Sequence, residues 1–181
     1  MKSTYILGIN SAYHELSAAL IRDGVLVAAV EEERFSRIKH GKTERDDPST
    51  LPVQSIAYCL GVAGITWEDV AEIGISIKPE KRLANIGVDA YFDQGDWGSK
   101  EGEERFQRNL AKLPRRLSTL AGYDISSKIR WIDHHLAHAA SSFLVSPYEE
   151  AAILAIDGIG EFATKDANNS RRKSLRVGNR K

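Results

Sequence analysis

The segment Asp133-His134-His135-Leu136-Ala137-His138 holds three of the five histidines of the chain. On a helix, residues four positions apart lie on the same face, so His134 and His138 can direct two imidazoles toward one point. Neutral imidazole binds zinc and divalent iron alike. The spacing therefore predicts a metal site on a helix, to which two histidines alone do not supply a full set of ligands.

A carboxylate for that site follows at the end of the next expected strand. The apolar strand Ala151–Ile156 ends at Asp157, and a binding crevice commonly forms where strands of an α/β sheet end. The predicted ligands are His134, His138 and Asp157. In the HExxH motif of metalloproteases the glutamate between the histidines is the general base. Here His135 stands in its place, which argues against hydrolysis of that kind. A surface helix whose histidines form no joint site remains the alternative.

The loop Asp157-Gly158-Ile159-Gly160-Glu161 is a second candidate. A strand that ends in an acid and glycines lets the backbone approach a phosphate without Cβ clashes, so Gly158 and Gly160 are candidate phosphate-binding residues. An Asp-Gly hairpin turn gives the same letters. The two interpretations are compatible.

The segment Gly8-Ile9-Asn10-Ser11-Ala12-Tyr13-His14-Glu15 lies where the first two expected strands are joined. His14 has a side chain suited to accepting a proton at neutral pH, which makes it a candidate general base. A turn histidine that packs or meets solvent is the alternative. Lys39 and His40 are a weaker signal, because a basic pair that follows Glu31–Glu33 is usually a solvated face.

Hydrophobic periodicity predicts an α/β chain that begins with strands and then alternates helices and strands. The first strands are Tyr5–Asn10, Ser17–Ile21 and Val25–Glu31. The intervening Arg22-Asp23-Gly24 favours a tight hairpin, since Asp-Gly accepts the positive φ of such a turn. We therefore expect a three-stranded meander within a single sheet, with helices packed against it.

Caps, breakers and apolar runs predict the later elements. They are a helix from Pro52 to Gly61 or Gly64, a short helix Trp67–Val70 capped by Thr66, a strand Glu72–Ile77, a helix Glu101–Leu120 broken at Pro114, a strand Lys128–Ile132, a helix His134–Leu144, and strands Ala151–Ile156 and Phe162–Lys165. Cys59 falls on the first of these helices, where we expect a buried thiol.

Composition and charge exclude some classes of function. The chain is 42% hydrophobic, yet no apolar run reaches the roughly 18–20 residues of a membrane span. A lone Cys59 permits no internal disulfide and favours a reducing, cytoplasmic compartment. The net charge is zero, but residues 167–181 carry six basic side chains and no acid. Removing those six from the 25 basic residues leaves 19 against 25 acidic ones, a body of −6 without a nucleic-acid footprint.

The basic tail lacks a clear helical or strand period. It is compatible with a disordered tail, with a patch for nucleic acid or membrane, or with a chain cut or frame-shifted within a domain. Composition favours the first.

Three long segments resemble the nodulation-type O-carbamoyltransferases, which include antibiotic-tailoring enzymes. The segments are GINSAYHELSAALIRDG, VAAVEEERFSRIKH and IDHHLAHAASSFLVSPYEEAAILAIDGIGE, and they extend as far as about Thr164. The resemblance implies an actin-like ATPase (ribonuclease H-like) fold. The chain would comprise the first lobe and the start of the second, as a partial transfer domain at residues 1–166 followed by the tail at 167–181.

The resemblance also implies the chemistry. Family members carry a C-terminal domain that makes carbamoyl-adenylate from carbamoyl phosphate and ATP. Their first domain passes the carbamoyl group to a hydroxyl of a sugar or another small, antibiotic-like acceptor. A divalent metal is held by the histidines of the HHLAH segment and by acids; it is Fe(II) in the best-described case, with zinc or manganese as alternatives. His134, His138 and Asp157 match those positions. His14 matches a histidine placed to deprotonate the acceptor, and Lys39 matches a basic position near the adenylate phosphate.

The sequence departs from the family in two places. Glu15-Leu16 stands where members commonly have Asp and a small residue, and after ATK the chain turns into the basic tail where the family continues its second lobe. A non-catalytic metal- or nucleotide-binding remnant of a broken reading frame is therefore a rival hypothesis. A fragment of a sugar-kinase-like phosphotransferase is another.

Overall fold

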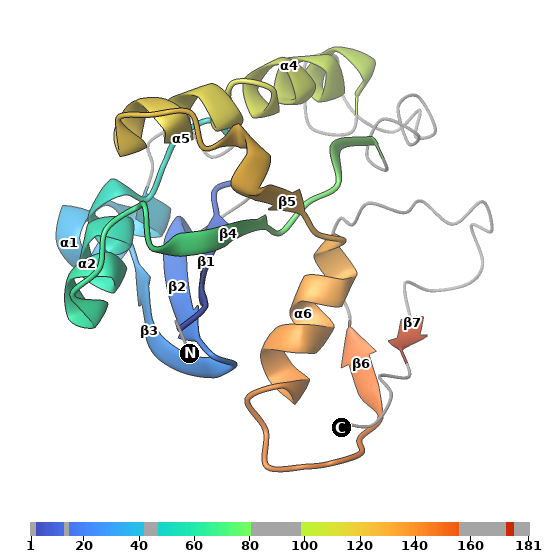
Figure 1. Cartoon of the computed structure of the whole chain (residues 1–181). Coiled ribbons are helices and arrows are strands. Elements are labelled where there is room, and N and C mark those ends of the chain that lie inside the picture. The colour runs from blue at the N-terminus through green and yellow to red at the C-terminus, as the bar shows by residue number, and fades with distance from the viewer. Residues whose placement is uncertain (1–2, 13–14, 42–46, 81–98, 156–172, 176–181) are drawn as a thin grey trace.

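A five-stranded sheet is the centre of the computed structural model, which describes residues 3–12, 15–41, 47–80, 99–155 and 173–175. The strands lie in the order β3-β2-β1-β4-β5 (Figure 1). Their bounds are β1 Tyr5–Asn10, β2 Ser17–Arg22, β3 Val25–Glu31, β4 Val70–Ile75 and β5 Ile129–Trp131. The expected α/β class and the opening three-stranded meander are confirmed.

Strand direction places several chain ends at one edge of this sheet. β2 is antiparallel to both β1 and β3, whereas β4 is parallel to β1 and β5 is parallel to β4. It follows that β3, β1, β4 and β5 run in the same direction. Their carboxyl ends meet at a single edge, where binding crevices form in α/β sheets, and the residues before β2 enter from that edge. This edge is called the carboxyl edge below.

The hairpin between β2 and β3 has the turn that the sequence predicts. Asp23 and Gly24 both have positive φ, 51° and 83°, as a tight two-residue turn requires. The Asp23 carboxylate also accepts a hydrogen bond from the backbone N–H of Thr4 at 2.8 Å. Local turn chemistry therefore fixes the register of the meander.

Two short helical segments and α2 follow the meander. α1 spans Glu33–Ser36, the 3₁₀ segment η1 spans Lys39–Gly41, and α2 spans Val53–Ala63. α2 ends at Gly64 in the left-handed conformation, one of the two ends expected. It packs on β2 and β3 and fully buries Cys59, as predicted. Burial raises the pKa of that thiol.

The expected long charged helix is two helices, α4 Lys100–Leu110 and α5 Leu113–Ala121. The break falls just before Pro114, which occupies the first turn of α5, where a missing N–H does no harm. Ser99 caps α4 by accepting a hydrogen bond from the N–H of Gly102. The short 3₁₀ segment η2, Ser126–Lys128, then leads into β5.

The C-terminal elements correct the expectation of a single sheet. α6 spans His134–Phe143, and β6 Ile153–Ala155 pairs with β7 Lys173–Leu175 in a separate antiparallel sheet. α6 lies beside β6 (Figure 1). β7 falls in a stretch where the sequence shows no strand period. Its backbone pairing with β6 determines the strand, and pairing of that kind leaves no trace in side-chain pattern.

The short helix predicted at Trp67–Val70 is wrong. The Thr66 backbone N–H donates to a carboxylate oxygen of Asp69 at 3.2 Å, but the residues that follow form a turn and Val70 already belongs to β4. Pairing of Val70 with β1 overrides the local capping signal. The strand predicted at Phe162–Lys165 lies outside the described residues.

The core lies between the central sheet and the helices. Its fully buried large side chains are Phe106, Leu7, Leu16, Leu20, Ile56, Ile73, Ile75, Ile77, Leu110, Leu113, Leu117 and Ile125. β1 and β4 supply alternate residues to it, as strands with one buried face do. Among the described residues, none of the helices is both long enough and apolar enough to cross a bilayer.

Gly41, the last residue of η1, passes close to Glu32 and Leu16, and this close approach gives a testable prediction. Gly41 has φ +76°, and a Cβ there would lie 2.8 Å from Cβ of Glu32 and 3.0 Å from Cβ of Leu16. We expect Gly41→Ala to lower the free energy of unfolding by about 2–4 kcal/mol, from left-handed strain and overpacking. Urea unfolding followed by circular dichroism measures it. The matched control is Gly61→Ala in α2, where a Cβ meets open space and should stabilise by about 0.5–1 kcal/mol. Equal changes in the free energy of unfolding for the two variants would contradict the close packing of Gly41 against Glu32 and Leu16.

Candidate functional site

The start of α6 places the first predicted ligand at the carboxyl edge. Asp133 caps the helix, its carboxylate accepting a hydrogen bond from the N–H of Leu136 at 3.2 Å. The Ile132 N–H donates to the carbonyl of Ile75 at 2.8 Å, which extends the pairing of β5 with β4. The chain therefore enters α6 directly from the sheet, and His134 is buried there with 8% of its surface exposed.

His134 is held in one tautomer by the end of β4. Its Nδ1 lies 3.0 Å from the carbonyl oxygen of Ser76. A carbonyl oxygen only accepts, so Nδ1 carries the proton and donates, and Nε2 of the neutral ring presents a lone pair. Metal-binding histidines are oriented in this way, with the other ring nitrogen donating to a backbone carbonyl or carboxylate.

His138 completes the pair on the same helix face. Its Nε2 lies 3.2 Å from Nε2 of His134, and the two rings are 4.6 Å apart between centroids at 76°. Metal–nitrogen bonds of about 2.0–2.1 Å at a tetrahedral angle place two ligand nitrogens about 3.3 Å apart. Because Nε2 of His134 presents a lone pair, the Nε2–H of His138 donates to it in this contact. With His138 in its other tautomer, the two nitrogens have the spacing that two ligands of a divalent cation require. His134 is buried and His138 exposed, so the site faces the surface.

The third predicted ligand, Asp157, lies outside the described residues. Within the described ranges, no group of three or more His, Cys, Asp or Glu side chains has the arrangement of a metal site. His135 follows His134 directly on α6, so it projects about 100° around the helix axis from the His134–His138 face, and its ring meets that of His134 edge-on at 5.8 Å between centroids. The structure thus joins His134 to His138, and the full ligand set stays a prediction.

Lys39 and Glu15 are brought to the carboxyl edge from different parts of the chain. Lys39 is exposed in η1. Its neighbour His40 contacts Glu15 through Nδ1 and Oε1 at 3.0 Å, and the carbonyl of His40 accepts a hydrogen bond from the N–H of Leu16. His40 therefore contacts the residue that follows His14, whereas Lys39 is exposed, as expected of a solvated face. The acid beside His14, Glu15, is the feature of the sequence that could have indicated a partner for His40.

Three further candidates fall outside the described residues. These are His14, Gly158 and Gly160. Their predicted roles are neither supported nor contradicted by the fold. The described neighbours of His14, Ala12 and Glu15, are on the carboxyl edge, because they link the end of β1 to the start of β2.

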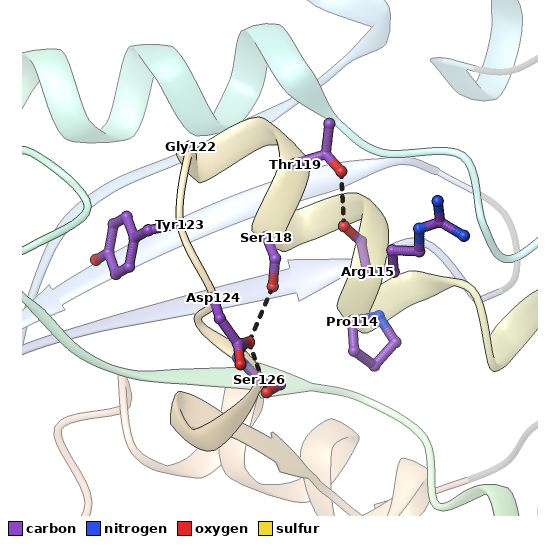
Figure 2. Close-up of a pocket in the computed structure, with 8 residues that line it drawn as sticks. All are labelled: Pro114, Arg115, Ser118, Thr119, Gly122, Tyr123, Asp124 and Ser126. Atoms are coloured by element: carbon purple, nitrogen blue, oxygen red, sulfur yellow. Dashed lines mark hydrogen bonds between the residues drawn. The ribbon is translucent and has the colours of Figure 1, made fainter.

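A surface pocket lies elsewhere, along α5 and the loop after it (Figure 2). Its volume is about 590 Å³. Asp124 in this pocket accepts hydrogen bonds from the Ser126 hydroxyl and N–H and from the Ser118 hydroxyl, and the Ser126 contacts foremost hold the pKa of its carboxyl below its usual value. Of the predicted site residues that the structure describes, none lines this pocket, and no pattern in the sequence predicted it.

Comparison with protein families finds a match over nearly the whole chain. The family described as carbamoyltransferase N-terminus matches residues 5–179. The matched range includes all of the residues proposed above as ligands, bases or phosphate contacts.

Two curated relatives share most of the chain. An uncharacterised protein of Synechocystis sp. is 37% identical over 174 residues, covering 89% of this chain and 26% of that protein. The nodulation protein NolNO of Sinorhizobium fredii is 34% identical over 157 residues, covering 86% of this chain and 21% of NolNO. The chain therefore spans about a quarter of the length of these relatives.

Among solved structures, YeaZ from Pseudomonas aeruginosa matches with a TM-score of 0.43 and 13% sequence identity, covering 96% of this chain and 65% of that one. A likeness at this level carries no weight for the site.

Proposed function

On the premise that this chain belongs to the carbamoyltransferase N-terminus family, we propose that it carries part of the carbamoyl-transfer site of an O-carbamoyltransferase. The group transferred is carbamoyl, from carbamoyl phosphate by way of carbamoyl-adenylate. The acceptor is a hydroxyl of a sugar or another small molecule. The chain spans about a quarter of its relatives, and we assign the adenylate-forming step to the C-terminal domain that the family resemblance implies.

The observation that carries the proposal is the geometry of the histidine pair. Two imidazole Nε2 atoms lie 3.2 Å apart, and one of the rings is fixed by the Ser76 carbonyl. His134, His138 and, by family resemblance, Asp157 would hold a divalent metal, Fe(II) first, with zinc or manganese as alternatives. Such an ion supplies Lewis-acid chemistry, which polarises a carbamoyl oxygen or holds phosphate.

The residues of the chain have distinct proposed roles in the transfer. The acceptor oxygen forms a bond to the carbamoyl carbon, and the bond from that carbon to the adenylate phosphate oxygen breaks, so AMP leaves with the electron pair. His14 accepts the proton of the acceptor hydroxyl. Lys39 would balance the charge of the departing phosphate, and the proposed role of Gly158 and Gly160 is to bind it through the backbone.

The finer description of the fold is proposed on the same basis. A three-stranded meander followed by two parallel strands in the order β3-β2-β1-β4-β5 supports assignment to the first lobe of an actin-like ATPase fold. α6 and β6 would then begin a second lobe, and β7, in the basic segment that follows, pairs with β6. The proposed transfer domain covers residues 1–166, and the basic residues 167–181 follow it.

The direct test supplies the proposed intermediate. The chain is incubated with an adenylate-forming domain of a longer relative, carbamoyl phosphate, ATP and candidate sugars, and carbamoylated product is detected by mass spectrometry. We expect product and AMP to form in step. A matched reaction with the His138→Ala chain should lose product but still form carbamoyl-adenylate. Absence of product from the unaltered chain, with carbamoyl-adenylate demonstrably present, would overturn the proposal.

A further inference from the structure

Asn10 ends β1, and Ser76 directly follows the neighbouring strand β4, at the carboxyl edge. β1 and β4 are parallel, with Gly8 opposite Gly74 and Ile9 opposite Ile75. Asn10 and Ser76 are therefore the next pair in that register. The hydroxyl of Ser76 donates to Oδ1 of Asn10 at 3.4 Å. The residue whose carbonyl orients His134 is thus joined, through its own side chain, to the end of β1.

The other end of the Asn10 amide contacts the segment before β2. Its Nδ2 donates to the carbonyl oxygen of Glu15 at 3.0 Å. A single planar amide therefore accepts on one side and donates on the other. Aspartate has the same shape but lacks the donor, and serine is too short to span both contacts. The Asn10 side chain therefore links Ser76, after β4, to the segment before β2.

Glu15 contacts η1 through its side chain. Its carboxylate contacts Nδ1 of His40 at 3.0 Å, and the backbone N–H of His40 donates to the carboxylate of Glu33 at 3.0 Å. Glu15 and His40 have φ values of 50° and 63°, in the left-handed region that non-glycine residues rarely adopt. Surrounding contacts must hold such a backbone in place, and the Asn10 and His40 hydrogen bonds are among them.

We propose that Asn10 is a positioning residue, which couples the orientation of the His134–His138 pair to the placement of Lys39 and His40. The inference rests on the proposed function, because it assigns the two ends of the connection to one site. The path runs from His134 to the Ser76 carbonyl, from the Ser76 hydroxyl to Asn10, and from Asn10 through Glu15 to His40. Coupling of this kind is reciprocal: cation binding at the pair should steady η1.

The experiment measures that coupling in the 181-residue chain. Co²⁺, visible by its absorption spectrum, is titrated onto the ¹⁵N-labelled protein, and exchange of the Leu16 and His40 backbone amides is followed by NMR. We expect saturating Co²⁺ to slow both amides by about fivefold, the effect of strengthening one ordinary hydrogen bond. In Asn10→Asp, which keeps the shape but loses the donor, the slowing should disappear. Asn109→Asp on α4 is the matched control and should behave as the unaltered chain.

The outcomes separate this inference from the proposed function. Slowing that persists unchanged in Asn10→Asp overturns the positioning role, as does Co²⁺ binding that leaves both amides of the unaltered chain unaffected. If the chain binds no Co²⁺, the proposed function loses its basis. The exchange rates of the metal-free proteins then decide the inference. Exchange of the two amides about fivefold faster in Asn10→Asp than in the unaltered chain supports the positioning role of Asn10, and equal rates overturn it. Should Asn10→Asp melt at a lower temperature than Asn109→Asp, Ser76→Ala replaces it with the same expected loss of coupling.

Discussion

His134→Ala and His138→Ala are each expected to abolish stoichiometric metal binding, while His135→Ala retains it. The two rings meet at Nε2, so removal of either leaves one imidazole to hold the ion. We expect an affinity loss of more than about 100-fold, since even the outer hydrogen-bond partners of metal ligands are worth about 10–100-fold. Elemental analysis of the purified protein and calorimetric titration with Fe²⁺ or Zn²⁺ measure it.

His135 is the control because it has the same chemistry on a different helix face. Its ring is set edge-on to His134 at 5.8 Å and does not take part in the Nε2 contact. Circular dichroism of all three variants checks that α6 still forms. An equal loss of metal from His135→Ala would contradict the pairing of residues four apart. Retention of bound metal by both His134→Ala and His138→Ala would show that the histidine pair is not the metal site.

The periodic features of the sequence predicted most of the elements, because periodicity records which face of an element is buried. The bounds of β1 and β3 agree with those expected, and α6 ends one residue before the predicted Leu144. The break at Pro114 likewise follows from the chemistry of one residue. These elements depend on local interactions, which a single sequence carries.

Contacts between distant residues could not be predicted in this way. The Ser76 carbonyl that orients His134 is 58 positions away in sequence, and Glu15 meets His40 across 25 positions. Strand pairing brings these groups together, and no period in the sequence specifies which strands pair. The helix at Trp67–Val70 was wrong for the same reason, since Val70 pairs with β1. Of the candidate site, spacing identified the His134–His138 pair but not the groups that hold it.

A second large effect is expected at Glu32, a buried carboxylate that caps α2 from outside the helix. Pro52, at the N-cap position, makes no side-chain hydrogen bond to α2. Glu32 replaces it: Oε1 accepts from the N–H of Gln54 at 3.0 Å, and Oε2 accepts from the N–H and hydroxyl of Ser55 at 2.8 and 2.7 Å. Only 5% of Glu32 is exposed. A negative charge there also favours the positive end of the helix dipole.

Glu32→Gln should therefore lower the free energy of unfolding by about 2–4 kcal/mol. The amide turns an N–H₂ group toward donors, and each charged hydrogen bond lost is worth about 1.5–3 kcal/mol, partly recovered by the remaining oxygen. Urea unfolding measures the change. Glu31→Gln is the matched control, because Glu31 pairs with Arg34 at 3.0 Å on the surface and such pairs are worth about 0–1 kcal/mol.

The effect of Glu32 should extend beyond α2. Its backbone N–H donates to the carbonyl of Leu16 at 2.7 Å, and its Cβ lies where a side chain at Gly41 would collide. The same residue thus anchors α2 and forms one wall of the crossing between the start of β2 and η1. We expect Glu32→Gln to speed amide exchange at both Leu16 and Ser55, whereas a residue that only caps α2 would affect Ser55 alone. Loss of protection confined to Ser55 would show that η1 and Lys39 are positioned independently of the carboxylate.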